Sequence, residues 1–263
     1  MRAIASDGTE AQAVDEGIGT PILVIHGGLG DSTVWAPVTD RLRDRFRTVR
    51  LHRRQYRMDL PRPVSMAQEV ERVAAIAAEL DLPVLVGHSS GAVLALEALV
   101  TDPAAYAGAV LYEPPLVIGE PLGGAKLVPA RAALAQDKPG QALAIFLRDV
   151  VRMSPLMARI AGFLIGHHPG YRQRVVRQLD DSDAIDALGI RLDEYAKLDL
   201  PILLVGGDRS PRHLAERLDA LERALPRTRR VVMHGQGHNA ERQAPDRVAR
   251  AIATFIDEDL PPR

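Results

Sequence analysis

The chain of 263 residues contains no cysteine, which excludes disulfide bonds and zinc sites built from thiolates. An excess of one charge is also lacking, because 33 Lys and Arg residues balance 34 Asp and Glu residues and leave a formal net charge of -1. Such a balance offers no electrostatic footprint for nucleic acid or an anionic membrane. No apolar run is long enough to span a bilayer, and residues 1–17 lack the apolar core of a signal peptide. We therefore expect a cytoplasmic protein that binds neither nucleic acid nor membrane.

Short runs rich in Val, Leu and Ile alternate with longer segments of helical periodicity. The apolar runs are nearly continuous, as in strands that helices cover on both faces. This alternation predicts an α/β fold with a mostly parallel, doubly wound sheet, and the N-terminal residues favour a hairpin at one sheet edge. The expected strands are 20–28, 47–53, 83–89, 107–115, 201–208 and 229–237, and the expected helices are 65–80, 92–100, 213–225 and 246–256.

The alternation is interrupted between residues 116 and 197, where helical stretches are punctuated by Pro and Gly and no strand is indicated. We interpret this segment as a helical insert that forms a cap or lid over a site, because function gathers where loops leave strand ends. The predicted organisation is an α/β core from residues 1–115 and 198–263, with a cap at 116–197. Apolar cap residues are expected to form mainly the interior of the cap, among them Leu116, Phe146, Met153, Met157 and Phe163.

The sequence Gly-His-Ser-Ser-Gly at residues 87–91, here called the serine turn, joins an expected strand to an expected helix. A strained, tight turn lifts the central Ser89 clear of the sheet, and side chains at Gly87 and Gly91 would collide there. Ser89 is therefore the predicted nucleophile, whereas the alternative is that it caps the following helix. Ser90 is not centred between the glycines, and its backbone N–H is expected to stabilise an oxyanion instead.

A serine nucleophile needs a base, and His238 is predicted to supply it from a Gly-rich loop after the last expected strand. His234 is the less favoured choice because it lies within the strand pattern. The third member is a carboxylate that orients the imidazole, and Asp208 at the end of the preceding strand gives the chain order Ser, Asp, His. Glu113, at a strand end before two prolines, is the alternative acid.

The stretch His26-Gly27-Gly28 follows an early strand and predicts an anion-stabilising loop. We expect the backbone N–H groups of Gly28 and Ser90 to form an oxyanion hole, with His26 bracing the loop. Leu29, Trp35 and Glu113 are candidate substrate-binding residues, although Trp35 has the alternative role of packing the first helix.

These elements together resemble the α/β-hydrolase-fold family over essentially the full length. The matching residues are His26-Gly27-Gly28, the serine turn, Asp208 and Gly237-His238, and the insert is placed like the helical cap of that family. One departure is the loop after the strand at 47–53, which lacks the Asp-x-Arg-Gly-x-Gly-x-Ser turn of many relatives, so Arg53, Arg54 and Tyr56 are either structural or substrate-facing.

The resemblance implies a serine hydrolase that cleaves an ester-type bond (carboxylester, thioester or lactone) of a small to medium, moderately hydrophobic substrate through an acyl-enzyme. No metal or organic cofactor is required, and a monomer or homodimer is expected. Two alternatives remain open. The first is a lyase, carbon–carbon hydrolase or perhydrolase that uses the same residues. The second is a ligand-binding protein with little turnover.

Overall fold

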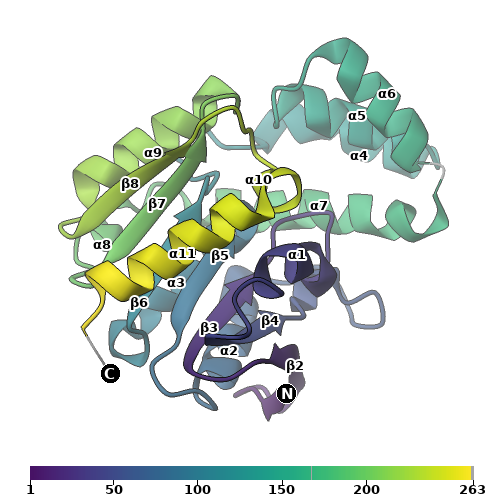
Figure 1. Ribbon diagram of the computed structural model, residues 1–263. Helices are drawn as coiled ribbons and strands as arrows, with labels where there is room; N and C mark the ends of the chain where they lie inside the picture. The colour runs from purple at the N-terminus through teal and green to yellow at the C-terminus, as the bar shows by residue number, and fades with distance from the viewer. Residues whose placement is uncertain (167, 262–263) are drawn as a thin grey trace.

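In a computed structural model, which describes residues 1–166 and 168–261, an eight-stranded sheet runs through the molecule (Figure 1) in the order β1-β2-β4-β3-β5-β6-β7-β8. β1 and β2 form an antiparallel hairpin, β2 pairs antiparallel with β4, and the remaining pairs are parallel. The mostly parallel sheet and its edge hairpin are therefore confirmed. The strands are β1 (Arg2–Ile4), β2 (Glu10–Glu16), β3 (Thr20–Ile25), β4 (Phe46–Leu51), β5 (Val84–His88), β6 (Gly108–Tyr112), β7 (Ile202–Gly207) and β8 (Thr228–Met233).

Helices cover both faces of this sheet because the central strands are apolar on both sides. Leu23 and Leu85 face one apolar cluster with α2, α3 and α9, whereas Ile22 and Val84 face a second cluster with α1 and α11. The local signal at the start of α2 is a capping box, in which Ser65 and Gln68 exchange side-chain and backbone hydrogen bonds. These helices are α1 (Ala36–Thr39), α2 (Met66–Ala77), α3 (Ser90–Thr101), α9 (Arg212–Ala224), α10 (Ala240–Gln243) and α11 (Pro245–Asp259), with 3-10 turns η1 (Ser32–Trp35), η2 (Arg54–Tyr56) and η3 (Pro103–Ala105).

Between β6 and β7 the described chain is helical, and a single bridge joins Val117 to Ile190. Proline occupies the first turn of α4, α5 and α7, where its missing N–H costs no helical hydrogen bond. Figure 1 shows α4, α5 and α6 projecting beyond the sheet, with α7 between them and the core. The elements are η4 (Gly124–Leu127), α4 (Val128–Ala135), α5 (Pro139–Asp149), α6 (Pro155–Gly166), α7 (Pro169–Leu188) and α8 (Leu192–Tyr195). That this segment caps a site stays a prediction.

Helix α7 is tied to the core by several polar contacts. Arg174 donates to the carbonyl of Leu29 at 3.3 Å and pairs with Asp31 at 2.7 Å. Gln55 of η2 donates to the carbonyl of Arg177 at 2.6 Å. The loop that precedes η1 is therefore held against α7 from the cap side. Within the described part of the chain, no helix is both long and apolar enough to cross a membrane.

Candidate active site

Ser89 occupies a strained position at the junction of β5 and α3. Its backbone lies at φ 53° and ψ -127°, a region that L-residues rarely adopt. A Cβ on Gly87 would approach the Cα of Ala92 to 2.5 Å, and a Cβ on Gly91 would meet the carbonyl oxygen of His26 at 2.4 Å. Both neighbours are backbone atoms and cannot move aside, so the steric reason for the two glycines is confirmed.

The side chain of Ser89 makes no capping hydrogen bond to α3, so the alternative of a simple helix cap is not met. Its backbone N–H donates to the carbonyl of Tyr112 at 2.9 Å, which fixes the turn to the end of β6. The hydroxyl of Ser90 instead accepts a hydrogen bond of 2.8 Å from Arg53. Of the two adjacent serines, Ser89 is partly exposed and Ser90 is buried.

His238 lies on the loop between β8 and α10, and its partner is Glu113. Nδ1 of His238 donates to Oε2 of Glu113 at 2.6 Å, and Oε1 of Glu113 accepts from the backbone N–H of Gly207 at 2.7 Å. The carboxylate side chain is 1% exposed and the imidazole is 22% exposed. Each oxygen of Glu113 thus accepts one hydrogen bond and is held in place. The carboxylate therefore orients the imidazole of His238 through Nδ1, and Nε2 takes no part in this hydrogen bond.

Asp208 lies elsewhere. Its carboxylate accepts from the backbone N–H of Gly235 at 2.7 Å and from Nδ1 of His234 at 3.1 Å, and its side chain is 42% exposed. The hydrogen bond from His234 lowers the pKa of Asp208. The expectation that Asp208 orients His238 is therefore corrected in favour of Glu113.

The physical reason lies in the surroundings of the two carboxylates. Glu113 follows β6 with its side chain buried, and each of its oxygens accepts one hydrogen bond, from Gly207 N–H and from His238, whereas the side chain of Asp208 is 42% exposed. The backbone of Glu113 takes a positive φ of 46°, which turns the chain at the strand end.

Two residues that sequence reasoning missed anchor the His238 loop. Nε2–H of His88 donates to the carbonyl of His238 at 2.8 Å, and burial followed by the charge of His238 holds the pKa of His88 well below its usual range. The hydroxyl of Tyr112 donates to the carbonyl of Gly237 and accepts from the N–H of Ala240. The indication of these two residues in the sequence is their position, since His88 directly precedes the predicted nucleophile and Tyr112 directly precedes Glu113.

The glycine loop after β3 approaches the serine turn from the other side. A Cβ on Gly27 would lie 3.0 Å from the Cβ of Ser89, so this loop packs directly on the nucleophile. His26 donates from Nδ1 to the carbonyl of Gly27 at 2.8 Å, and burial lowers the pKa of His26 to about 3. The imidazole of His26 is neutral and braces the loop. The oxyanion role of Gly28 and Ser90 stays a prediction.

Arg53 joins the two segments that carry these N–H groups. Its guanidinium donates to the carbonyl of His26 at 3.3 Å, to Ser90 at 2.8 Å and to Asp181 of α7 at 2.7 Å. It also pairs with Glu69 at 3.2 Å, and its side chain is fully buried. Arg53 is therefore structural. Arg54 pairs with Asp7, and Tyr56 donates to Asp181 at 2.9 Å, so both have structural contacts, and whether either faces the substrate stays a prediction.

The other predicted contacts divide into buried and partly exposed groups. Trp35 is 1% exposed in the core beside His88, so it packs the first helix and does not line a pocket. Leu29 is partly buried at a positive φ of 57°, and its contact with substrate stays a prediction.

Among the apolar cap residues, Leu116 and Phe146 are interior and Met153 packs against the same core cluster. Met157 and Phe163 are exposed, which corrects the expectation for those two.

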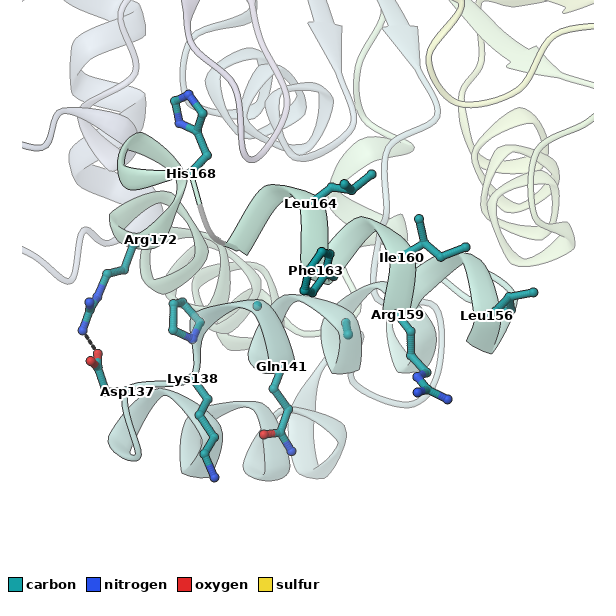
Figure 2. Close-up of a pocket in the computed structure, with 13 residues that line it drawn as sticks. Asp137, Lys138, Gln141, Leu156, Arg159, Ile160, Phe163, Leu164, His168 and Arg172 are labelled. Atoms are coloured by element: carbon teal, nitrogen blue, oxygen red, sulfur yellow. Dashed lines mark ion pairs between the residues drawn. The ribbon is translucent and has the colours of Figure 1, made fainter.

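A cavity of about 1120 Å³ lies in the cap segment between α5, α6 and the start of α7. Figure 2 shows Leu156, Ile160 and Leu164 along α6, with the ion pair of Asp137 and Arg172 at one end. Neither Ser89 nor His238 lines it, so this cavity is separate from the candidate site. Across the described residues, no three His, Asp or Glu side chains gather closely enough to hold a metal ion.

Comparison with known proteins agrees with the geometry. A sequence profile of the alpha/beta hydrolase family matches residues 22–251, which is most of the chain. The protein belongs to the alpha/beta hydrolase family.

This alpha/beta hydrolase is 28% identical over 254 residues to 2-(acetamidomethylene)succinate hydrolase of Mesorhizobium japonicum, across 92% of this chain and 90% of that one. An alpha/beta hydrolase from Sphaerobacter thermophilus superposes with a TM-score of 0.83 at 25% identity, over 97% of this chain and 100% of its own. The esterase RhEst1 from Rhodococcus sp. ECU1013 gives 0.73 at 21% identity over 98% of both chains, a likeness of fold alone.

Proposed function

We propose that this alpha/beta hydrolase is a serine hydrolase that cleaves an ester-type bond of a small to medium, moderately hydrophobic acyl compound. Ser89 is the nucleophile, His238 the general base and Glu113 the carboxylate that orients it. The observation that carries the proposal is the 2.6 Å hydrogen bond between His238 and the buried Glu113, on a loop that His88 fastens to the serine turn.

In the proposed reaction, Nε2 of His238 accepts the hydroxyl proton of Ser89 as the serine oxygen attacks the substrate carbonyl carbon. The negative charge that develops on the carbonyl oxygen is stabilised by the N–H groups of Gly28 and Ser90. The imidazolium then protonates the leaving group, and the acyl-enzyme forms. Water, deprotonated by His238, attacks this ester and releases the acid, which restores Ser89.

Glu113 serves this cycle in two ways. By accepting the Nδ1 proton of His238 it leaves Nε2 as the lone-pair nitrogen that faces away from the carboxylate. Because the side chain of Glu113 is only 1% exposed, its interaction with the transient imidazolium is weakly screened by water. The second hydrogen bond, from Gly207, prevents the carboxylate from rotating away.

A second candidate is cleavage of an amide-type bond by the same residues. It is supported by the 28% identity to a protein whose name describes hydrolysis of an acetamido compound. A screen of esters, thioesters, lactones and amides with a common acyl group, with products identified by mass spectrometry, separates these two and also reveals lyase or perhydrolase chemistry.

The test is hydrolysis of p-nitrophenyl esters by the purified protein and its variants. Ser89→Ala is expected to lower kcat/KM by several orders of magnitude, because the acyl-enzyme cannot form. Ser154→Ala removes an exposed hydroxyl from the cap segment and serves as the matched control with wild-type rates. Turnover that persists in Ser89→Ala would contradict the proposal.

A further inference from the structure

Three basic side chains, Arg152, His213 and Arg217, form what we call the basic cluster. Arg217 of α9 is 7% exposed, and its guanidinium donates to the carbonyls of Leu116 at 2.7 Å and His213 at 2.8 Å. In the described part of the chain, neither Arg217 nor Arg152 forms an ion pair with a carboxylate. A buried guanidinium normally has such a partner, because desolvation of an unpaired charge is costly.

His213 is the second member of the basic cluster and is 3% exposed. Its Nδ1 has no hydrogen-bond partner among the described residues, although buried polar atoms are rarely left so. Burial, followed by the charges of Arg217, Arg152 and His238 and opposed by Glu113, lowers the pKa of His213 to about 4. The neutral imidazole therefore retains an unused nitrogen in a positive environment.

Arg152 approaches from the cap segment. It lies just after α5 with a positive φ of 61°, a position where glycine is preferred because a side chain strains the backbone. The flanking amides fix this conformation, since Val151 N–H donates to Phe146 and Met153 N–H donates to Leu147. The side chain of Arg152 is exposed, and after burial its positive charge is among the causes that lower the pKa values of both His213 and Arg217.

The basic cluster adjoins the candidate active site. Leu116, whose carbonyl binds Arg217, follows Glu113 by three residues, and α9 follows the strand whose Gly207 binds that same glutamate. The carboxylates near the cluster already have partners of their own. Glu113 binds His238, Asp186 accepts from the amides of residues 122–124, and Glu216 pairs with Arg212.

Because Arg217 and Arg152 form no ion pair among the described residues and Nδ1 of the buried His213 has no partner there, we propose that the basic cluster binds a carboxylate group of the substrate. The enzyme would then act on acyl compounds that carry a second, free carboxylate, held by Arg152 from the cap side and by Arg217 and His213 from the core side. A carboxylate is the planar, bidentate acceptor that guanidinium groups match. The inference rests on the proposed function, because it names the substrate class of the same site.

The test compares two esters with the same leaving group and five-carbon acyl chain, mono-p-nitrophenyl glutarate and p-nitrophenyl pentanoate. The wild-type protein is expected to have the higher kcat/KM for the glutarate ester. Arg152→Ala is expected to lower the ratio of the two kcat/KM values by about tenfold or more, since it removes a charge-assisted hydrogen bond. Arg159→Ala removes another exposed arginine from the cap segment and should leave the ratio unchanged.

Binding without turnover gives an independent measurement. Isothermal titration of glutarate into Ser89→Ala protein is expected to show binding that the additional Arg152→Ala change weakens by about tenfold. If both esters are cleaved through Ser89 but the ratio is unaffected by Arg152→Ala, the carboxylate site is wrong and the proposed function stands. If neither ester is cleaved while glutarate binding still depends on Arg152, the proposed chemistry fails instead. Absence of both turnover and glutarate binding would overturn both.

Discussion

Single residues decide which carboxylate orients His238. Glu113 and Asp208 end neighbouring parallel strands, yet only Glu113 is buried, and only Glu113 hydrogen-bonds His238. Asp208 instead fastens the turn at His234 and Gly235. The roles of the two side chains can therefore be distinguished by substitutions that keep the size of the side chain and remove its charge.

Glu113→Gln is expected to lower kcat by roughly 10³- to 10⁴-fold, because the amide cannot hold the imidazole in the required tautomer. Asp208→Asn is expected to change kcat by less than about tenfold, since its loss affects an exposed turn. Steady-state kinetics with a p-nitrophenyl ester, alongside circular dichroism to confirm folding, make the comparison. A large loss confined to Asp208→Asn would reverse the assignment.

A second prediction concerns Glu241, which is 1% exposed and has an unpaired Oε2 in the described structure. Burial raises the pKa of Glu241 from 4.5 to about 7. Between these values the folded protein binds the proton and the unfolded chain does not, so stability falls as pH rises through this window. The expected loss from this group is about 3 kcal/mol by pH 8.

Urea unfolding at pH 5 and pH 8 measures this effect. Glu241→Gln cannot titrate, so the difference in unfolding free energy between the two pH values should shrink. Glu120→Gln, at an exposed cap position, should retain the wild-type difference. An unchanged pH dependence in Glu241→Gln would show that other groups are responsible.

Residue types were predictable from sequence where backbone sterics dictate them. Ser89 and its flanking glycines follow from the impossibility of a Cβ at Gly87 and Gly91, and His238 follows from its place after the last strand. Glu113 and Asp208 were not separable in this way. Both follow parallel strands at the same end of the sheet, and the choice depends on which carboxylate is buried beside His238, which only the tertiary structure shows.

At the scale of secondary-structure elements, buried polar contacts hold α7 against the core. The buried Arg53 lies between Glu69 of α2 and Asp181 of α7, and Tyr56 donates to the same Asp181. The sequence indicated helical stretches here, but not that α7 would run to Leu188 and end at Gly189, whose φ is 66°. The pairing partner of Arg53 lies 128 residues away, a distance that local periodicity does not reveal.

Asp181→Ala is expected to destabilise the protein by about 3–5 kcal/mol, because the buried guanidinium of Arg53 loses one of its two carboxylates. Asp183→Ala, on the same helix, removes an exposed carboxylate that pairs with Arg131 and should cost less than about 1 kcal/mol. Chemical denaturation of both variants measures the difference. Equal free energies of unfolding would mean that the buried pair does not tie α7 to the core.

At the scale of the whole molecule, the alternation of apolar runs and helical segments was enough to predict a mostly parallel sheet, and the N-terminal residues indicated its edge hairpin. Each central strand is apolar on both faces, so few alternative arrangements bury it. The placement of the helices between β6 and β7 depends instead on contacts such as Arg174 with Asp31, which no local pattern encodes.

The central claim, that Ser89 is an activated nucleophile, is tested most directly by mass spectrometry of the intact protein after incubation with a fluorophosphonate. The wild-type protein is expected to gain one covalent adduct, mapped by proteolysis to Ser89, and Ser89→Ala should gain none. An adduct on Ser89→Ala protein, or an unmodified wild-type protein that still hydrolyses esters, would contradict the claim.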